Sequence, residues 1–247
     1  MNQNDHEVKL TIVVPVYNEI ESLPRLARRL GTYLDDCPVK SCVLFVDDGS
    51  TDGSGEVIAE ICTRDQRFGF LRFSSNRGLS SAIKAGIDRC RTELLGYIDA
   101  DLQTAPEDFD LLLSHIEKYD GVVGYRAKRQ DTWSKKIQSK IANTVRRKLI
   151  DDHIIDTGCP LKLFRSEIVK KLPFFDGMHR FWPALVQLEG GTIKQVPVRH
   201  FPREAGESKF NFFNRSLRPL QDLFAYRWMK NRKIRYRIEE EKLDCMR

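Results

Sequence analysis

Apolar segments rich in β-branched residues alternate with amphipathic segments, and this alternation constrains the fold more than any other feature of the chain. An apolar, β-branched run is typical of a buried parallel strand. The amphipathic segment from Leu23 to Leu34 carries leucines at helical spacing. The segments expected to form the first strands are Val8 to Val16, Cys42 to Val46, Phe70 to Phe73, Leu94 to Ile98 and Gly121 to Gly124. Strands that alternate with helices over short connections predict an α/β fold with a mostly parallel central sheet flanked by helices.

The rest of the chain is less regular but extends the same pattern. Leu161 to Phe164 and Thr192 to Phe201 are expected to be strands, and Phe181 to Leu188 is expected to be a helix. No strong linker divides the 247 residues, a length that often makes one domain. We therefore predict one domain over residues 1–209, followed by a basic amphipathic helical tail over residues 210–247 that is not an independent domain.

Two pairs of aspartates follow predicted strands. Asp47 and Asp48 come after the second strand, and Asp99 and Asp101 come after the fourth, with Gln103 two residues further on. Ligands of parallel α/β sheets bind at the carboxyl ends of the strands, so both pairs are expected at the same edge. Oxygen ligands suit Mg²⁺ and Mn²⁺, which commonly bridge protein carboxylates to substrate phosphates. This pattern favours a metal-assisted site for a nucleoside diphosphate.

Positive charge is concentrated in two segments, although the net charge of the whole chain is only +6. Arg126 to Lys148 and Lys209 to Arg237 each contain nine Lys and Arg against one Asp. Such segregation predicts an anionic partner. A nucleic acid is not expected, because the aspartates at the ligand edge would repel it. No apolar run is long enough to span a bilayer, and the polar start from Met1 to Glu7 lacks a signal-peptide core. We expect a cytoplasmic protein.

An ordered set of short motifs resembles the family 2 glycosyltransferases of the GT-A fold, most of all their dolichol-phosphate mannose synthase-like branch. The resemblance covers roughly residues 8 to 210. The motifs are Pro15-Val16-Tyr17-Asn18-Glu19, Asp47-Asp48-Gly49-Ser50, Asn76-Arg77-Gly78, Asp99-Ala100-Asp101-Leu102-Gln103, Gly124-Tyr125-Arg126 and Arg203-Glu204-Ala205-Gly206-Glu207-Ser208-Lys209. The resemblance implies metal-dependent, inverting transfer of one sugar from a UDP- or GDP-sugar to a polyprenyl phosphate. It also implies a peripheral position on the cytoplasmic (inner) membrane face.

The same resemblance implies roles for individual residues. The donor would be held by Pro15, Tyr17, Glu19, Val46, Asp48, Asp99 and Ala100. Mg²⁺ or Mn²⁺ would be held by Asp99, Asp101 and Gln103. The residues expected to act in the transfer are Asp101, Arg126, Asp156, Arg203 and Lys209. Of these, Arg126, Arg203 and Lys209 would contact phosphates. Ser139 and Asn143 are expected to face the acceptor.

Several alternatives stay open at this level. Asp156 is a base for a hydroxyl acceptor, an orienting carboxylate near the sugar, or a residue that forms a turn. The acceptor could instead be a sugar hydroxyl of a glycan or glycolipid, and the whole chain could be an anionic-surface binding module without catalysis. The tail could bind a membrane surface, its own domain or a second subunit, so a homo-oligomer is also open.

Overall fold

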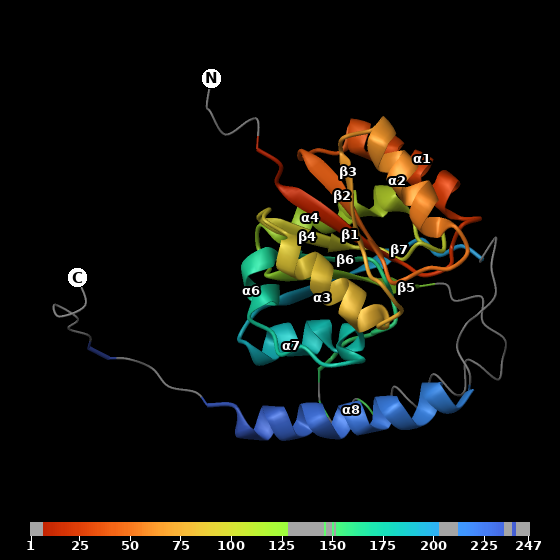
Figure 1. The fold of residues 1–247 in the computed structure, drawn as a ribbon. Coiled ribbons are helices and arrows are strands. Elements are labelled where there is room, and N and C mark those ends of the chain that lie inside the picture. The colour runs from red at the N-terminus through yellow and green to blue at the C-terminus, as the bar shows by residue number, and fades with distance from the viewer. Residues whose placement is uncertain are drawn as a thin grey trace, which may run out of the picture.

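The computed structural model describes residues 7–127, 146, 150, 152–202, 212–234 and 239–240, with the backbone alone for residues 212–220. A seven-stranded sheet with the order β3-β2-β1-β4-β6-β5-β7 forms its centre (Figure 1). The strands are β1 (Leu10–Val16), β2 (Ser41–Asp47), β3 (Phe68–Arg72), β4 (Leu94–Tyr97), β5 (Gly121–Arg126), β6 (Lys162–Arg165) and β7 (Ile193–Val198). The helices are α1 (Leu23–Asp36), α2 (Ser54–Arg64), α3 (Leu79–Arg89), η2 (Pro106–Asp108), α4 (Phe109–Ile116), α6 (Ser166–Lys170), η3 (Met178–Arg180), α7 (Trp182–Leu188) and α8 (Phe212–Arg232).

The sheet is parallel except for β6. Strand β1 pairs in parallel with β2 and β4, β2 with β3, and β5 with β7. Strand β6 lies between β4 and β5 and runs antiparallel to both. The predicted α/β fold with a mostly parallel sheet is confirmed. The expected strand and helix segments named above all occur, with ends shifted by a few residues. The reversal of β6 was not predicted.

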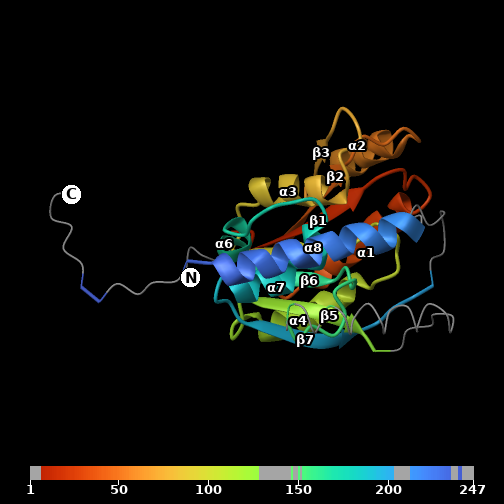
Figure 2. The same ribbon diagram turned by 90° about the horizontal axis from the view of Figure 1, so that it is seen from below.

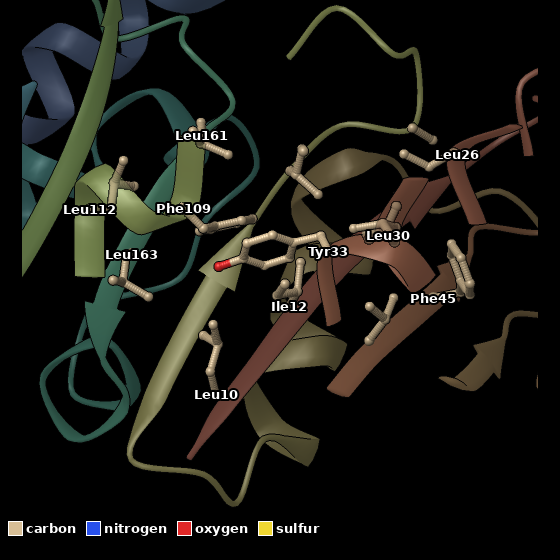
Figure 3. Packing of buried hydrophobic residues seen from close by; sticks show 14 of the residues in the cluster. Leu10, Ile12, Leu26, Leu30, Tyr33, Phe45, Phe109, Leu112, Leu161 and Leu163 are labelled. Atoms are coloured by element: carbon tan, nitrogen blue, oxygen red, sulfur yellow. The ribbon is translucent and has the colours of Figure 1, made fainter. Parts of the chain in front are cut away.

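Helices cover both faces of the sheet, and each face has its own apolar cluster. Side chains alternate along β1, so Ile12 joins the cluster beneath α1 and α4, whereas Val13 joins the cluster beneath α3. In Figure 3, Leu30 and Tyr33 of α1 lie near Ile12, with Phe109 of α4 beside them. Both faces are therefore buried, which explains why every residue of β1 except Thr11 is apolar.

Helix α8 packs on the face that carries α7 (Figures 1 and 2). Leu223 and Tyr226 are buried in the cluster of that face, and the Tyr226 hydroxyl donates to the carbonyl of Ala184 at 3.0 Å. Phe224 and Trp228 point the other way and are 57% and 65% exposed. No helix in the part of the chain described here has the length and apolarity needed to cross a bilayer.

Candidate active site

The carboxyl ends of β1, β2, β4 and β5 meet at one edge of the sheet, because these strands run in the same direction. The loops that follow them carry most of the residues singled out in the sequence. This edge therefore brings together side chains that are more than 100 residues apart in the chain, from Tyr17 to Asp156.

The loop after β1 is fastened to the loop after β2. The Asn18 amide donates to the Ser50 hydroxyl at 2.9 Å, and the Asn18 side-chain oxygen accepts from the Thr51 amide at 2.8 Å. The Glu19 amide donates to the Ser54 hydroxyl at 2.9 Å. Asn18 has a positive φ of 52°, a conformation that asparagine tolerates better than most residues. These contacts fix the rim next to Tyr17, whose side chain is partly exposed.

Asp48 holds the turn at residues 76–78. Its carboxylate accepts from the Arg77 amide at 2.6 Å, the Gly78 amide at 2.8 Å and the Asn76 side-chain amide at 3.0 Å. Burial raises the pKa of Asp48, although the Arg77 and Gly78 amides act in the opposite direction. Next to it, Gly49 has φ +69°, and a Cβ there would lie 2.5 Å from the Ser75 backbone. Only glycine fits this approach, so the two loops form one rigid wall.

Three of the predicted donor-binding residues offer no exposed side chain. Pro15 and Ala100 are buried, and Val46 lies fully buried in the cluster beneath α3. A nucleotide can reach only backbone atoms at such positions. Tyr17 and Glu19 remain accessible at the rim, and Glu19 accepts from the Ser22 hydroxyl at 3.2 Å. The assignment of all five to the donor stays a prediction.

Asp99 and Asp101 follow β4 and lie half-buried at the centre of the edge. The buried Tyr97 hydroxyl donates to Asp99 Oδ1 at 2.5 Å. Burial, and then the negative charge of Asp101, raise the pKa of Asp99 to about 6. Because the charge of Asp101 disfavours the ionised form of Asp99, a positive charge between the two carboxylates would be stabilising.

The turn after the aspartates is held in an unusual conformation. Leu102 has φ 61°, which is rare for a bulky side chain and marks a constrained site. Asp101 Oδ1 accepts from the Gln103 amide at 3.1 Å, which closes the turn. Gln103 also contacts the segment that follows β7, because the Gln103 carbonyl accepts from the Phe201 amide at 2.9 Å. The turn is thus anchored at both of its ends.

The residues of this turn fit a hard divalent cation. The donor set is two carboxylates and one amide oxygen, the ligand type of Mg²⁺ and Mn²⁺. Burial beside Asp101 raises the pKa of Asp99, and a cation bound between the two carboxylates would favour its ionised form. Within the described ranges, no group of three or more His, Cys, Asp or Glu side chains forms a complete metal cage. A cation here would need further oxygens, which a substrate diphosphate can supply.

Arg126 and Asp156 form the other half of the site. Arg126 ends β5, and its guanidinium donates through Nε to Asp156 Oδ2 at 2.7 Å and through Nη2 to Oδ1 at 2.8 Å. The Arg126 amide also donates to Oδ2 at 3.2 Å, and the Gly158 amide donates to Oδ1 at 3.2 Å. Asp156 therefore orients Arg126 and also shapes its own turn, which combines two of the roles left open by the sequence.

Two residues of the site, Tyr97 and Lys162, were not predicted from the sequence, whereas Asp47 was predicted at this edge without a role of its own. Asp47 is buried, accepts from the Ser50 amide at 2.9 Å and pairs with Arg72 Nε at 3.3 Å. Tyr97 holds Asp99, and Lys162 lies buried between the two halves of the site. One signal was present for Lys162, since it is a charged residue inside the apolar segment from Leu161 to Phe164. No local signal marks Tyr97.

Some predicted residues lie outside the described part of the chain. Arg203 and Lys209, expected on phosphates, belong to this group. So do Ser139 and Asn143, expected at the acceptor. Their roles stay predictions.

Comparison with known proteins identifies the family of the chain. The sequence model of glycosyl transferase family 2 matches residues 11–173 of the chain. That match covers well over half of the 247 residues.

Solved structures share the fold at low sequence identity. A mannosyltransferase from Pyrobaculum calidifontis, in complex with GDP-Man and Mn²⁺, is 17% identical with a TM-score of 0.63 over 93% of this chain. This chain spans 66% of that protein's length. Mannosyl-3-phosphoglycerate synthase from Rubrobacter xylanophilus is 16% identical with a TM-score of 0.69, over 95% of this chain and 79% of the other.

A third structure is glucosyl-3-phosphoglycerate synthase from Mycobacterium tuberculosis in complex with Mg²⁺ and UDP. It is 13% identical with a TM-score of 0.68, over 90% of this chain and 79% of the other. Both complexes pair a nucleotide or nucleotide sugar with a divalent cation. The chain belongs to glycosyl transferase family 2 and is a glycosyltransferase that uses a nucleotide-sugar donor.

Proposed function

We propose that the chain transfers one hexose from a UDP- or GDP-sugar to a polyprenyl phosphate at a membrane surface, with inversion at the anomeric carbon. This is the activity of the dolichol-phosphate mannose synthase-like branch. The observation that supports the proposal is the hydrogen bonding of Asp156 to Arg126. This carboxylate is held against Arg126 by three hydrogen bonds and is nearly buried.

A hydroxyl acceptor needs a base to remove its proton, and Asp156 was the candidate base. A carboxylate that already accepts two charge-assisted hydrogen bonds from a guanidinium is a weak base. A phosphate acceptor is anionic at neutral pH and needs no proton removal. The pairing of Asp156 with Arg126 therefore favours an acceptor that is already charged.

The chemistry then depends on charge stabilisation. An oxygen of the acceptor phosphate attacks the anomeric carbon while the bond to the diphosphate breaks, and the bonding electrons leave with the nucleoside diphosphate. Asp99, Asp101 and Gln103 would hold Mg²⁺ or Mn²⁺, which neutralises charge on the diphosphate when bound. Arg126 is fixed in direction by Asp156 and can contact a phosphate with its planar fork. Arg203 and Lys209 are proposed to add further cations.

Helix α8 supports the membrane part of the proposal. Its exposed face combines Phe224 and Trp228 with Arg227, whereas Leu223 and Tyr226 hold the opposite face on the domain. An apolar face beside basic residues suits the interface of an anionic membrane. The tail then serves both its own domain and a lipid surface.

The test is a panel of donors and acceptors with Mn²⁺, analysed by mass spectrometry. UDP-glucose, UDP-N-acetylglucosamine and GDP-mannose are each offered with undecaprenyl phosphate, dolichyl phosphate and 3-phosphoglycerate. The expected product is a polyprenyl phosphate that has gained one hexose. Transfer to 3-phosphoglycerate alone would refute the lipid acceptor and favour a small phosphorylated one.

Two variants test the role of Asp156. Asp156→Asn and Arg126→Lys are each expected to lower kcat about 100-fold, because both lose the fixed guanidinium. If Asp156 only orients Arg126, the dependence of the residual kcat on pH keeps its wild-type shape in Asp156→Asn. Loss of the acidic limb of that profile would show that Asp156 acts as a base.

A further inference from the structure

Lys162 is a buried cation that no motif of the chain accounts for. It is the first residue of β6, and its backbone lies opposite Tyr97 on β4 and Val123 on β5. The residue is only 3% exposed. Lysine is almost never buried to this extent unless its ammonium has partners, because the charge loses its hydration.

The ammonium contacts both halves of the site. Nζ donates to the carbonyl of Cys159, in the turn that carries Asp156. Nζ also lies 5.2 Å from the ring centroid of Tyr97, a cation–π distance, and Tyr97 holds Asp99 through its hydroxyl. The rings of Tyr97 and Trp182 pack at an interplanar angle of 77° with centroids 5.6 Å apart, which leaves the tyrosine ring little freedom.

Both positive and negative side chains lie near Lys162. Burial, and to a smaller extent Arg126, lower the pKa of Lys162, while the carboxylates of Asp99 and Asp156 act in the opposite direction. Folding alone does not require such a group, because a buried ion can often be replaced by an apolar residue of similar volume without loss of stability. A role in the site gives a reason for its presence.

We propose that Lys162 is a positioning residue that fixes the distance between the metal-binding carboxylates and the Arg126–Asp156 pair. Each half of the site ends at one contact of the ammonium: the Cys159 carbonyl for Arg126–Asp156, and the Tyr97 ring for Asp99. A diphosphate that bridges a cation at Asp99 and Asp101 and a guanidinium at Arg126 needs both at one spacing. The inference rests on the nucleotide-sugar activity and not on the choice of acceptor.

The test measures how much Mn²⁺ tightens the binding of UDP or GDP. The quantity is the ratio of the nucleotide Kd without Mn²⁺ to that with Mn²⁺, measured by calorimetry on the full chain. Lys162→Met removes Nζ and keeps the unbranched stem. We expect this ratio to fall about 10-fold and kcat about 100-fold, as is typical of a misplacement near 1 Å, with the metal-free Kd and the Tm nearly unchanged.

The other possible roles of Lys162 predict different changes in this ratio. If Lys162 acted only through its charge, its removal would reduce the repulsion of Mn²⁺ and the ratio would rise. If Lys162 were only part of the core, Tm would fall and the ratio would not change. Either result overturns the proposal. Lys162→Gln, which is shorter and uncharged, gives the same fall and replaces Lys162→Met if that variant does not fold.

Two further variants complete the design. Ile87→Val is the control: Ile87 belongs to the same apolar cluster as Tyr97 and Trp182 but lies away from the site, so the ratio is expected to stay unchanged. Tyr97→Phe removes the hydrogen bond to Asp99, and its effect on the ratio should not add to that of Lys162→Met, because both act through Asp99. Full additivity would contradict the route through Tyr97. A wild-type chain that binds nucleotide with Mn²⁺ but modifies no polyprenyl phosphate refutes the acceptor and leaves this test intact.

Discussion

At the scale of single residues, the site keeps charge where the fold would be more stable without it. Asp99 is half-buried beside Asp101, and because burial and this neighbouring charge raise its pKa to about 6, keeping it ionised at neutral pH lowers the stability of the metal-free fold. Asp99→Asn should therefore raise the metal-free free energy of unfolding at pH 7.5 by about 1–3 kcal/mol. The same change should abolish the increase in Tm that Mn²⁺ and nucleotide give the wild type. Urea unfolding and thermal scans measure the two effects, with the exposed Asp36→Asn as control. A less stable metal-free Asp99→Asn would contradict this account.

His179 gives a second prediction at the same scale. Burial, followed by the charges of Arg180 and Lys162, lowers the pKa of His179 to about 3, and its Nδ1 lies 3.0 Å from the Ser80 hydroxyl. The unfolded chain binds a proton at His179 below about pH 6.5, whereas the folded chain does not until near pH 3, so stability is lost as the pH falls through this window. Between pH 6 and 4, the unfolding free energy of His179→Gln should fall by up to about 1.4 kcal/mol less per pH unit than that of the wild type. Parallel curves for the wild type and the variant would refute it. His115→Gln, on α4, is the control.

Sequence reasoning reached some of these residues and missed others for a physical reason. Asp48, Asp99 and Arg126 follow strands, so their common edge could be predicted from chain direction alone. Tyr97 and Lys162 meet only because β6 inserts antiparallel between β4 and β5, and no local pattern encodes a pairing across 65 residues. Periodicity also predicts that Val46 lies on a strand. It does not predict which face of the sheet the Val46 side chain lies on, because that depends on the helix that covers each face.

At the scale of elements, the close approach of α3 to β1 limits what the helix can carry. A Cβ on Gly86 would lie 2.5 Å from Val13 Cγ1. Gly86→Ala should therefore cost about 1–3 kcal/mol of unfolding free energy from crowding, which outweighs the gain of up to about 1 kcal/mol in helix propensity. Gly31→Ala on α1 meets only Phe68 at 4.0 Å and should stabilise. In urea unfolding, Gly86→Ala with Val13→Ala should be less destabilised than the sum of the single changes. Simple additivity would show that Val13 is not the obstacle.

At the scale of the whole molecule, α8 faces two environments. Deletion of the tail would remove Leu223 and Tyr226 and expose the apolar cluster that they cover, so it would test stability and membrane binding together. Phe224→Ser with Trp228→Ser changes only the exposed face. This double variant should keep the wild-type Tm and lose at least 10-fold in affinity for vesicles of phosphatidylglycerol and phosphatidylcholine, because two interfacial anchors are removed. Leu111→Ser, also on an exposed position at 47%, should bind vesicles as the wild type does. Equal flotation of all three proteins would exclude the lipid-facing role of α8.

The ion pair between Arg126 and Asp156 has a consequence for how the enzyme can diversify. It joins the end of β5 to the turn before β6 and so ties together the two ends of a stretch of 29 residues. Loop-closure entropy grows only slowly with length, so insertions between Arg126 and Asp156 cost little as long as buried residues such as Ile150 and Ile154 are kept. The length and sequence of this segment can therefore differ between homologues that use different acceptors, while the residues that bind the donor stay the same.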